Sequence, residues 1–316
     1  MNKKIRKIGA FFLSFLVTAT FLGQGQQAQA ASSAPRLAYT LKGLPKTSAV
    51  QNFSITNDAI YVVQKENGNG DLMLVKYNKS NSKKVGTMKL KGFGHGESLE
   101  VAKNNKGVEY VYIAAQKYKD KNGNIWSTQL SRLKFVDGKT VYSDNVPRLR
   151  DMNYANRSNV SIGTVKRFNF AISSDNKYFV LRIQNTNNSI QFSKYSHNYI
   201  DSLLDIAERN KTSVSMRNRQ KNCSIGFYQR YKTSVNSPNG SFQGMELSSN
   251  GNIFTSGGGT STGATITKMN SRGEFVKRIN ISQWRGYEIE GLHLNGSLYA
   301  TYKTGTNVAK IYIINF

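Results

Sequence analysis

Cysteine is almost absent from this chain, and its scarcity limits both the fold and the chemistry. Cys223 is the only one, so an intramolecular disulfide is excluded and the fold must be held by its core. It lies in the basic stretch RNRQKNCSIGF without a nearby histidine, which favours a structural thiol over a nucleophile. Histidine is also scarce, and no HExxH motif or clustered Cys/His spacing occurs. We therefore expect neither a metal nor a cofactor.

Acidic residues are few: 18 Asp and Glu stand against 44 Lys and Arg, giving a formal net charge of +26. Such an excess attracts polyanions and raises the rate of encounter with them, but it does not specify a fold. The N-terminal sequence, described in the next paragraph, predicts export from a bacterium, and the polyanions outside such a cell are teichoic acids, anionic lipids and extracellular nucleic acid. We expect the partner to be an envelope polyanion or glycan, with peripheral membrane contact and no dedicated nucleic acid partner.

Long apolar runs are absent except at the N-terminus, where MNKKIRKIGAFFLSFLVTATFLGQGQQAQA has the pattern of a signal peptide. The apolar run is shorter than the roughly 20 residues that span a bilayer, which argues against an uncleaved anchor. We predict a signal peptide over residues 1–30 and a single mature domain over 31–316, carrying a net charge of +22 because the signal contains four basic and no acidic residues. The protein is expected to be secreted by a Gram-positive bacterium, with or without attachment to the cell wall.

Helical periodicity is rare, and most of the mature chain consists of short apolar strands separated by Asn, Gly, Ser and Asp turns. One two-strand unit recurs, with a polar residue at most of its starts. Its five copies are QNFSITNDAIYVVQ from Gln51, ESLEVAKNNKGVEYVYIAA from Glu97, FNFAISSDNKYFVLRI from Phe168, QGMELSSNGNIFTSGG from Gln243 and EGLHLNGSLYATYK from Glu290.

The copies start 46, 71, 75 and 47 residues apart, close to one propeller blade or one blade with an insertion. We predict an all-β fold, a five-bladed β-propeller, over a sandwich that repeats hairpins by chance. Insertions are expected in blades two and three, with one short helix near residues 199–210. A last strand ending at Phe316 is expected to pair with residues near Leu37–Leu41 and close the ring.

The starts of the repeats place polar groups at one mouth of the propeller channel. The candidate ligand-binding residues there are Gln51, His95, Glu97, Gln243 and Glu290. A polar ring that satisfies backbone groups is the structural alternative, and it is favoured over a catalytic pair formed by two of the glutamates. Glu100 is expected on the opposite side from Glu97, so these two do not form an acid–base pair. No catalytic residue is assigned.

A basic, aromatic segment at 209–232 is the second candidate binding feature. Guanidinium and ammonium groups neutralise phosphates, while aromatic rings stack on bases or sugars. A solvated basic loop is the alternative. The candidate polyanion-binding residues are Arg217, Arg219, Lys221, Arg230, Tyr231 and Lys232.

Three motifs carry a resemblance to a known family: GFGHGESLEV before the second repeat, QGMELSSNGNIF at the fourth, and EIEGLHLNGSLYATY near the end. With its length, charge and lack of cysteine, the chain resembles the helveticin J-like large bacteriocins over nearly all of its mature length. The resemblance implies a heat-labile antibacterial protein that acts on related Gram-positive bacteria. It supplies no catalytic constellation to transfer.

The sequence therefore predicts a secreted bacteriocin that binds an anionic or glycan component of the target envelope. Two alternatives remain open. One is a glycan-cleaving cell-wall hydrolase that uses carboxylates of the channel mouth. The other is a lectin-like surface adhesion protein.

Overall fold

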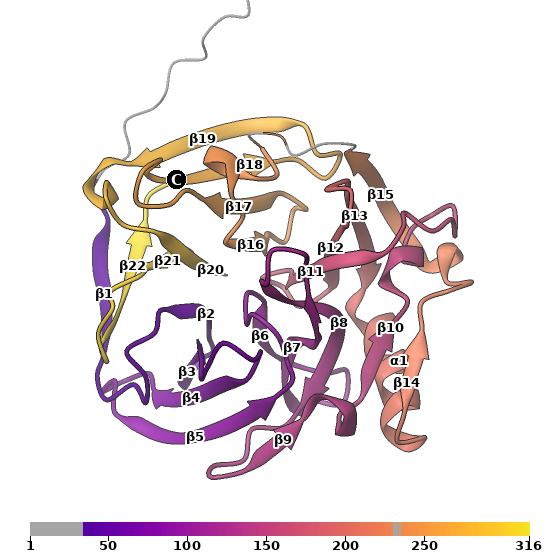
Figure 1. The fold of residues 1–316 in the computed structure, drawn as a ribbon, viewed down its shortest axis with the longest axis horizontal. Helices are drawn as coiled ribbons and strands as arrows, with labels where there is room; N and C mark the ends of the chain where they lie inside the picture. The colour runs from indigo at the N-terminus through magenta and orange to yellow at the C-terminus, as the bar shows by residue number, and fades with distance from the viewer. Residues whose placement is uncertain (1–33, 230–232, 234) are drawn as a thin grey trace, which may run out of the picture.

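The computed structural model describes residues 34–229, 233 and 235–316, and within them five β-sheets stand in a ring around a central axis (Figure 1). This confirms the predicted five-bladed β-propeller. The predicted signal peptide lies outside the described residues, as do Arg230, Tyr231 and Lys232 of the basic segment.

Each sheet is one blade, and its strands lie side by side in order from the axis to the outside of the ring. Blade one contains β2 (Val50–Ile55), β3 (Ala59–Lys65), β4 (Leu72–Asn78), β5 (Lys84–Lys91) and β9 (Thr140–Tyr142). Blade two contains β6 (Leu99–Lys103), β7 (Glu109–Lys119), β8 (Ile125–Leu133), β10 (Arg148–Arg150) and β14 (Ser213–Ser215). Blade three contains β11 (Val165–Ile172), β12 (Tyr178–Asn185), β13 (Ile190–Ser196) and β15 (Cys223–Gln229).

The last two blades complete the ring. Blade four contains β16 (Gly244–Leu247), β17 (Ile253–Gly257), β18 (Ala264–Met269) and β19 (Phe275–Ile281). Blade five contains β20 (Ile289–Asn295), β21 (Ser297–Tyr302), β22 (Ala309–Ile314) and β1 (Arg36–Leu41). The innermost strands are thus β2, β6, β11, β16 and β20, at or beside the five predicted repeat starts.

The ring closes by pairing the two ends of the chain. Strand β1 pairs antiparallel with β22, from Arg36 opposite Ile313 to Leu41 opposite Ala309. The expected pairing of the last strand with residues near Leu37–Leu41 is confirmed. Strand β1 is thus the fourth, outermost strand of blade five and covers the outer edge of β22.

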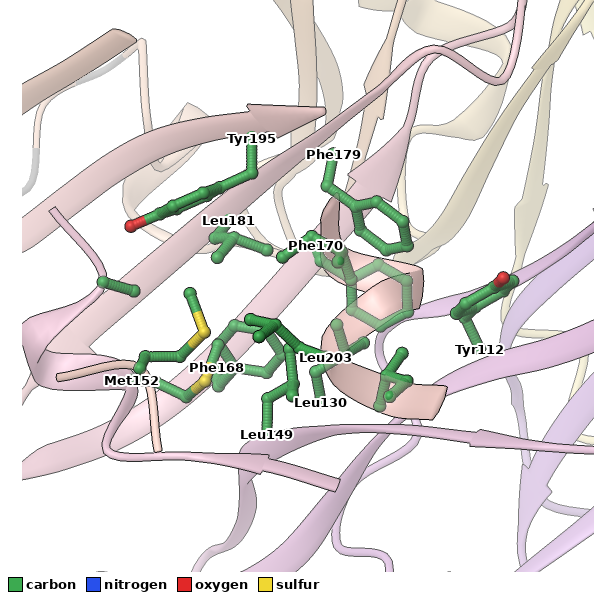
Figure 2. Packing of buried hydrophobic residues seen from close by; sticks show 14 of the residues in the cluster. Tyr112, Leu130, Leu149, Met152, Phe168, Phe170, Phe179, Leu181, Tyr195 and Leu203 are labelled. Atoms are coloured by element: carbon green, nitrogen blue, oxygen red, sulfur yellow. The ribbon is translucent and has the colours of Figure 1, made fainter. Parts of the chain in front are cut away.

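The core is divided into five apolar clusters, one at each interface between neighbouring blades. This follows from strand alternation, since successive side chains point to opposite faces of a blade and both faces contact another blade. The largest cluster lies between blades two and three, where Phe168, Phe170 and Phe179 pack with Tyr112 and Leu181 (Figure 2). The five clusters hold the innermost strands at fixed positions around the axis.

One α-helix occurs in the described part of the chain, α1 (His197–Arg209), which coincides with the predicted helix and begins two residues earlier. Ser196 caps it by accepting a hydrogen bond from the Tyr199 amide at 3.2 Å. Its apolar face, with Ile200, Leu203 and Leu204, joins the cluster between blades two and three. Short 3-10 turns lie at Ser143–Asn145, Met152–Tyr154, Gln220–Asn222, Pro238–Gly240 and Ser282–Trp284.

The segments beyond the regular blade strands add two further strands at outer edges. Strand β9 pairs in parallel with β5 of blade one, and β14 pairs in parallel with β10 of blade two. Among the described residues, no helix has the length and apolar character required to cross a membrane.

Candidate functional sites at the two channel mouths

All five sequence-predicted mouth residues line one cavity of about 420 Å³. We call it the Glu97 mouth, after the acidic group whose contacts are best defined. Strands from all five blades or the residues next to them contribute to its wall. Its lining residues are Gln51, Lys65, His95, Glu97, Asn124, Trp126, Lys166, Arg167, Gln184, Gly240, Ser241, Phe242, Gln243, Glu288, Glu290 and Lys303.

β-bulges turn several of these side chains toward the cavity. The pairing register shifts at Gln51 in β2, at Lys166 in β11, and across Glu290 and Gly291 in β20. A bulge leaves a residue out of the ladder and re-aims its side chain. In blade three it brings Arg167 to the cavity, whereas the predicted repeat start Phe168 packs in the core. Arg167 was not predicted from the sequence because the bulge displaces the cavity-lining position of this repeat by one residue, from Phe168 to Arg167.

Glu97 is held by a buried ion pair with Arg167. The Nε of Arg167 donates to Glu97 Oε2 at 2.6 Å, and its Nη2 donates to Glu97 Oε1 and, at 2.6 Å, to the Phe242 carbonyl. The same guanidinium lies 4.4 Å from the centre of the Trp126 ring. Both carboxylate oxygens of Glu97 are therefore engaged within the protein, and the pair joins blade two to blade three.

His95 presents a hydrogen-bond acceptor to this cavity. Burial lowers the pKa of His95 to about 4 despite the nearby Glu97 carboxylate, so the ring is neutral at pH 7. Its Nδ1 lies 3.1 Å from the Ile125 carbonyl, and a contact with a carbonyl requires the proton to be on Nδ1. Nε2 then carries a lone pair, and stacking on Trp126 at 4.7 Å between ring centres fixes the ring orientation.

Glu290 is the least compensated acid in the Glu97 mouth. Burial, with the charge of nearby Glu288, raises its pKa well above the ordinary value. In the same cavity, burial lowers the pKa of Lys65 although three glutamates oppose that shift. Gln243 donates through Nε2 to Glu288 at 2.6 Å, which fixes the amide at the rim.

The basic, aromatic segment is only partly described. Arg217 is exposed, and its guanidinium lies 4.1 Å from the centre of the Tyr154 ring and 3.8 Å from Asp151. Lys221 is exposed and Arg219 is half-buried. These positions leave polyanion binding by this segment as a prediction.

The opposite end of the channel contains a second cavity, of about 250 Å³, which we call the Glu100 mouth. Glu100 lies there, at the other end of the channel from Glu97, so the two carboxyls do not share a site. Glu100 meets two residues that sequence reasoning did not bring together with it, Glu246 and His293, with one potential ligand atom from each within 4.8 Å of the others. Burial raises the pKa of Glu100 to about 8, and burial together with Glu100 raises that of Glu246 well above its ordinary value.

A signal for this cluster existed in the repeat. Glu100, Glu246 and His293 each stand three residues after an aligned repeat start, at Glu97, Gln243 and Glu290. Equivalent positions on the innermost strands converge around the axis of a propeller. Metal-binding sequence motifs place their ligands close together in the chain, and no such motif marks these three residues because they are far apart in sequence.

Solved structures that resemble this chain do so with low sequence identity and low TM-scores. They include a luciferin-regenerating enzyme (12% identity, TM-score 0.43, covering 90% of this chain and 96% of that one). A glucose dehydrogenase has 11% identity and a TM-score of 0.41, with 90% and 100% covered. An exo-β-1,3-galactanase from Phanerochaete chrysosporium has 9% identity and a TM-score of 0.46, with 90% and 64% covered. At TM-scores below 0.5 the likeness carries no argument about either the fold or the function of this chain.

No curated protein sequence matches the chain. The family model described as bacteriocin helveticin-J, in contrast, matches residues 27–313, which is nearly the whole sequence and includes all three motifs of the resemblance. The chain therefore belongs to the helveticin J family of bacteriocins.

Proposed function

We propose that this protein is a secreted bacteriocin that recognises a glycan component of the envelope of related Gram-positive bacteria through the Glu97 mouth. Family membership supports the antibacterial role. The observation that carries the binding proposal is the cavity of about 420 Å³ at the channel end, lined by fixed donors and acceptors from every blade. Concave sites with a few convergent polar groups are the usual form of small-ligand sites.

The charges of the Glu97 mouth favour a polyhydroxylated ligand over a polyanion. Arg167 is paired with Glu97, Lys166 lies 3.3 Å from Asp120, and Lys303 lies 3.7 Å from Glu288. Of the four Lys and Arg side chains in the lining, only Lys65 makes no ion pair with a described residue, so the mouth has little surplus positive charge to neutralise phosphates. Neutral His95 and the amides of Gln51 and Gln243 offer both acceptors and donors, the groups that hydroxyls require.

The net charge then has a separate role. A mature charge of +22 concentrates the protein at teichoic acids or anionic lipids and raises its encounter rate with the cell surface. This attraction is screened by salt. We expect total envelope binding to fall at raised ionic strength, and unchanged binding at high salt would contradict the charge-led step.

The decisive experiment incubates purified protein with isolated walls of sensitive cells and measures pull-down together with the release of reducing sugars. Gln243→Ala removes an amide side chain from the cavity lining. We expect it to weaken wall binding about tenfold, which corresponds to a loss of roughly 1.4 kcal/mol of binding free energy. Gln283→Ala is the matched control, because Gln283 is exposed and outside the cavity. Equal binding by the two variants would refute the Glu97 mouth as the recognition site.

A glycan-cleaving activity is the second candidate, and one observation favours it. Glu290, with its raised pKa, lies in the same cavity as the Arg167-paired Glu97, and carboxyls in contrasting environments are the pattern of an acid and its partner. The occupied oxygens of Glu97 oppose it. Glu290→Gln separates the candidates: sugar release that falls about 10²–10⁴-fold supports catalysis, since that is the usual contribution of a general acid.

A lectin-like adhesion protein would use the same binding site, and it would differ from a bacteriocin only in that the bound cells are not killed. Killing of sensitive cells by the purified protein supports the bacteriocin. Wall binding without killing supports adhesion.

A further inference from the structure

We propose that the Glu100 mouth is a divalent-cation site in which Glu100, Glu246 and His293 each supply one ligand. The donor set is one imidazole nitrogen and two carboxylate oxygens. Imidazole suits transition metals better than Mg²⁺ or Ca²⁺, so the cation class is that of Zn²⁺ or Mn²⁺. This site is independent of the Glu97 mouth and of the ligand proposed there.

The side chain of His293 supplies the observation that distinguishes this group from an ordinary acidic cluster. Its Nε2 lies 3.0 Å from the Ile55 carbonyl, so the proton is on Nε2 and Nδ1 carries a lone pair. Nδ1 is buried, has no hydrogen-bond partner among the described residues, and lies 3.7 Å from Glu100 Oε2. The His293 residue is only 6% exposed, and its unpartnered nitrogen faces the two carboxyls.

Both carboxyls are oriented by backbone amides of neighbouring blades. The Ile172 amide donates to Glu100 Oε1 at 3.3 Å, and the Leu294 amide donates to Glu246 Oε2 at 3.1 Å. Ligands of metal sites are commonly oriented by such outer hydrogen bonds, as His293 is by Ile55. Three potential ligand groups therefore converge in fixed directions, and a cation that binds them would displace the proton retained by the two carboxyls.

The spacing suits a single ion. The three ligand atoms lie within 4.8 Å of one another. A cation bound about 2.0–2.2 Å from each of them requires the ligand atoms to be roughly 3.5 Å apart. Side-chain movements of about 1 Å would therefore bring the ligands to the distances that a bound ion needs. The adjoining cavity of about 250 Å³ provides an entry path and room for water ligands. Its rim includes Asn57, Asp58 and Asn295.

Such an ion would connect three blades, because the ligands come from β6, β16 and β20 of blades two, four and five. An ion that binds only the folded ring stabilises it in proportion to the logarithm of its concentration. The expected consequence is a metal-dependent rise in the melting temperature of the whole propeller.

The test strips the purified mature protein with a chelator and titrates Zn²⁺, Mn²⁺, Ca²⁺ and Mg²⁺ separately, by calorimetry and thermal denaturation. We expect one equivalent of Zn²⁺ or Mn²⁺ to bind and raise the melting temperature. Glu246→Gln and His293→Gln should each weaken binding at least 100-fold. Glu290→Gln is the matched control, since it makes the same change in a buried carboxyl at the other mouth; its metal affinity, and its melting-temperature rise relative to its own metal-free form, should equal those of the wild type.

Three outcomes overturn the proposal: no binding by the wild-type protein, equal binding by Glu246→Gln, or tighter binding of Ca²⁺ or Mg²⁺ than of the transition metals. A measurement on the wild type covers the case in which the variants misfold. Co²⁺ placed in the site should give one hyperfine-shifted imidazole N–H resonance in the NMR spectrum, from Nε2 of His293. Absence of that resonance in a Co²⁺-bound protein also overturns the proposal.

Discussion

At the scale of single residues, the Glu97 mouth depends on charges that are buried in compensating pairs. Glu97 and Arg167 are each almost fully buried, and every oxygen of the carboxylate is hydrogen-bonded. Removing one member of such a pair leaves the other charge buried without compensation. The pair is therefore best regarded as structural support that positions the free groups around it.

Replacing Arg167 with Met should destabilise the protein by about 3–5 kcal/mol, the usual cost of breaking a buried pair on one side. Lys166→Met is the control, because the neighbouring Lys166 is partly exposed and makes only an ion pair with Asp120. We expect the control to cost less than about 1 kcal/mol. Urea denaturation measures the unfolding free energy of both variants. Similar losses of unfolding free energy would show that the buried Arg167–Glu97 pair is no more important for stability than the partly exposed Lys166–Asp120 pair.

Glu290 should make stability depend on pH. Its folded pKa lies well above the unfolded value of about 4.3, so the folded state retains a proton that the unfolded state releases. Its contribution is complete below the unfolded pKa and is lost as pH rises through the folded pKa. The charged groups that face it are Glu288, Lys65, Glu97 and Lys303.

The measurement compares the unfolding free energy of the wild type with that of Glu290→Gln between pH 4 and pH 8. The advantage of the wild type over the variant should shrink as pH rises. A constant difference would mean that Glu290 titrates alike in the folded and unfolded states.

At the scale of elements, the innermost strands approach each other so closely that side-chain size is restricted. The position after each aligned repeat start is Asn52, Ser98, Asn169, Gly244 or Gly291. Asn52 donates to the Glu97 carbonyl at 2.8 Å, and Asn169 lies 3.3 Å from the Ser98 hydroxyl. The amide side chains at this level thus connect the inner strands of blades one, two and three, and the glycines allow the inner strands of blades four, five and one to approach closely.

Gly291 tests this arrangement. A Cβ on Gly291 would lie 2.5 Å from Oδ1 of Asn52 and 2.8 Å from its Cα, so Gly291→Ala should destabilise the ring by about 1–3 kcal/mol through overpacking. Gly68→Ala is the control, because a Cβ there meets nothing within 4 Å. Thermal denaturation of both should show a loss only for Gly291→Ala; an unchanged melting temperature would contradict the close approach.

At the scale of the whole molecule, the ring is stable only as a closed unit, because each apolar cluster needs a blade on either side. The cluster between blades five and one includes Leu41 of β1, which is completely buried, beside Phe53 and Ile311. Without β1, strand β22 would become an exposed edge and this cluster would lose part of its cover.

A chain that begins at Lys42 should therefore lose cooperative unfolding or aggregate, whereas a chain that begins at Ala34 should fold. Size-exclusion chromatography and thermal denaturation of the two truncations measure this. Cooperative folding of the shorter chain at the same melting temperature would show that closure by β1 is dispensable.

The sequence by itself determined the number of blades, the position of the helix and the pairing of the chain ends. Strand alternation and the spacing of repeats are local patterns, set by which faces must be buried. It also identified the five predicted residues around the Glu97 mouth, because equivalent repeat positions share one end of the channel.

Only the tertiary structure decided which groups meet. The bulge in β11 that brings Arg167 to Glu97 is a change of register that no residue pattern marked. Glu100, Glu246 and His293 are separated by 146 and 47 positions in the sequence and become neighbours because three blades converge on one axis. Contacts of this kind depend on ring closure, so their distances and burial are properties of the folded propeller as a whole.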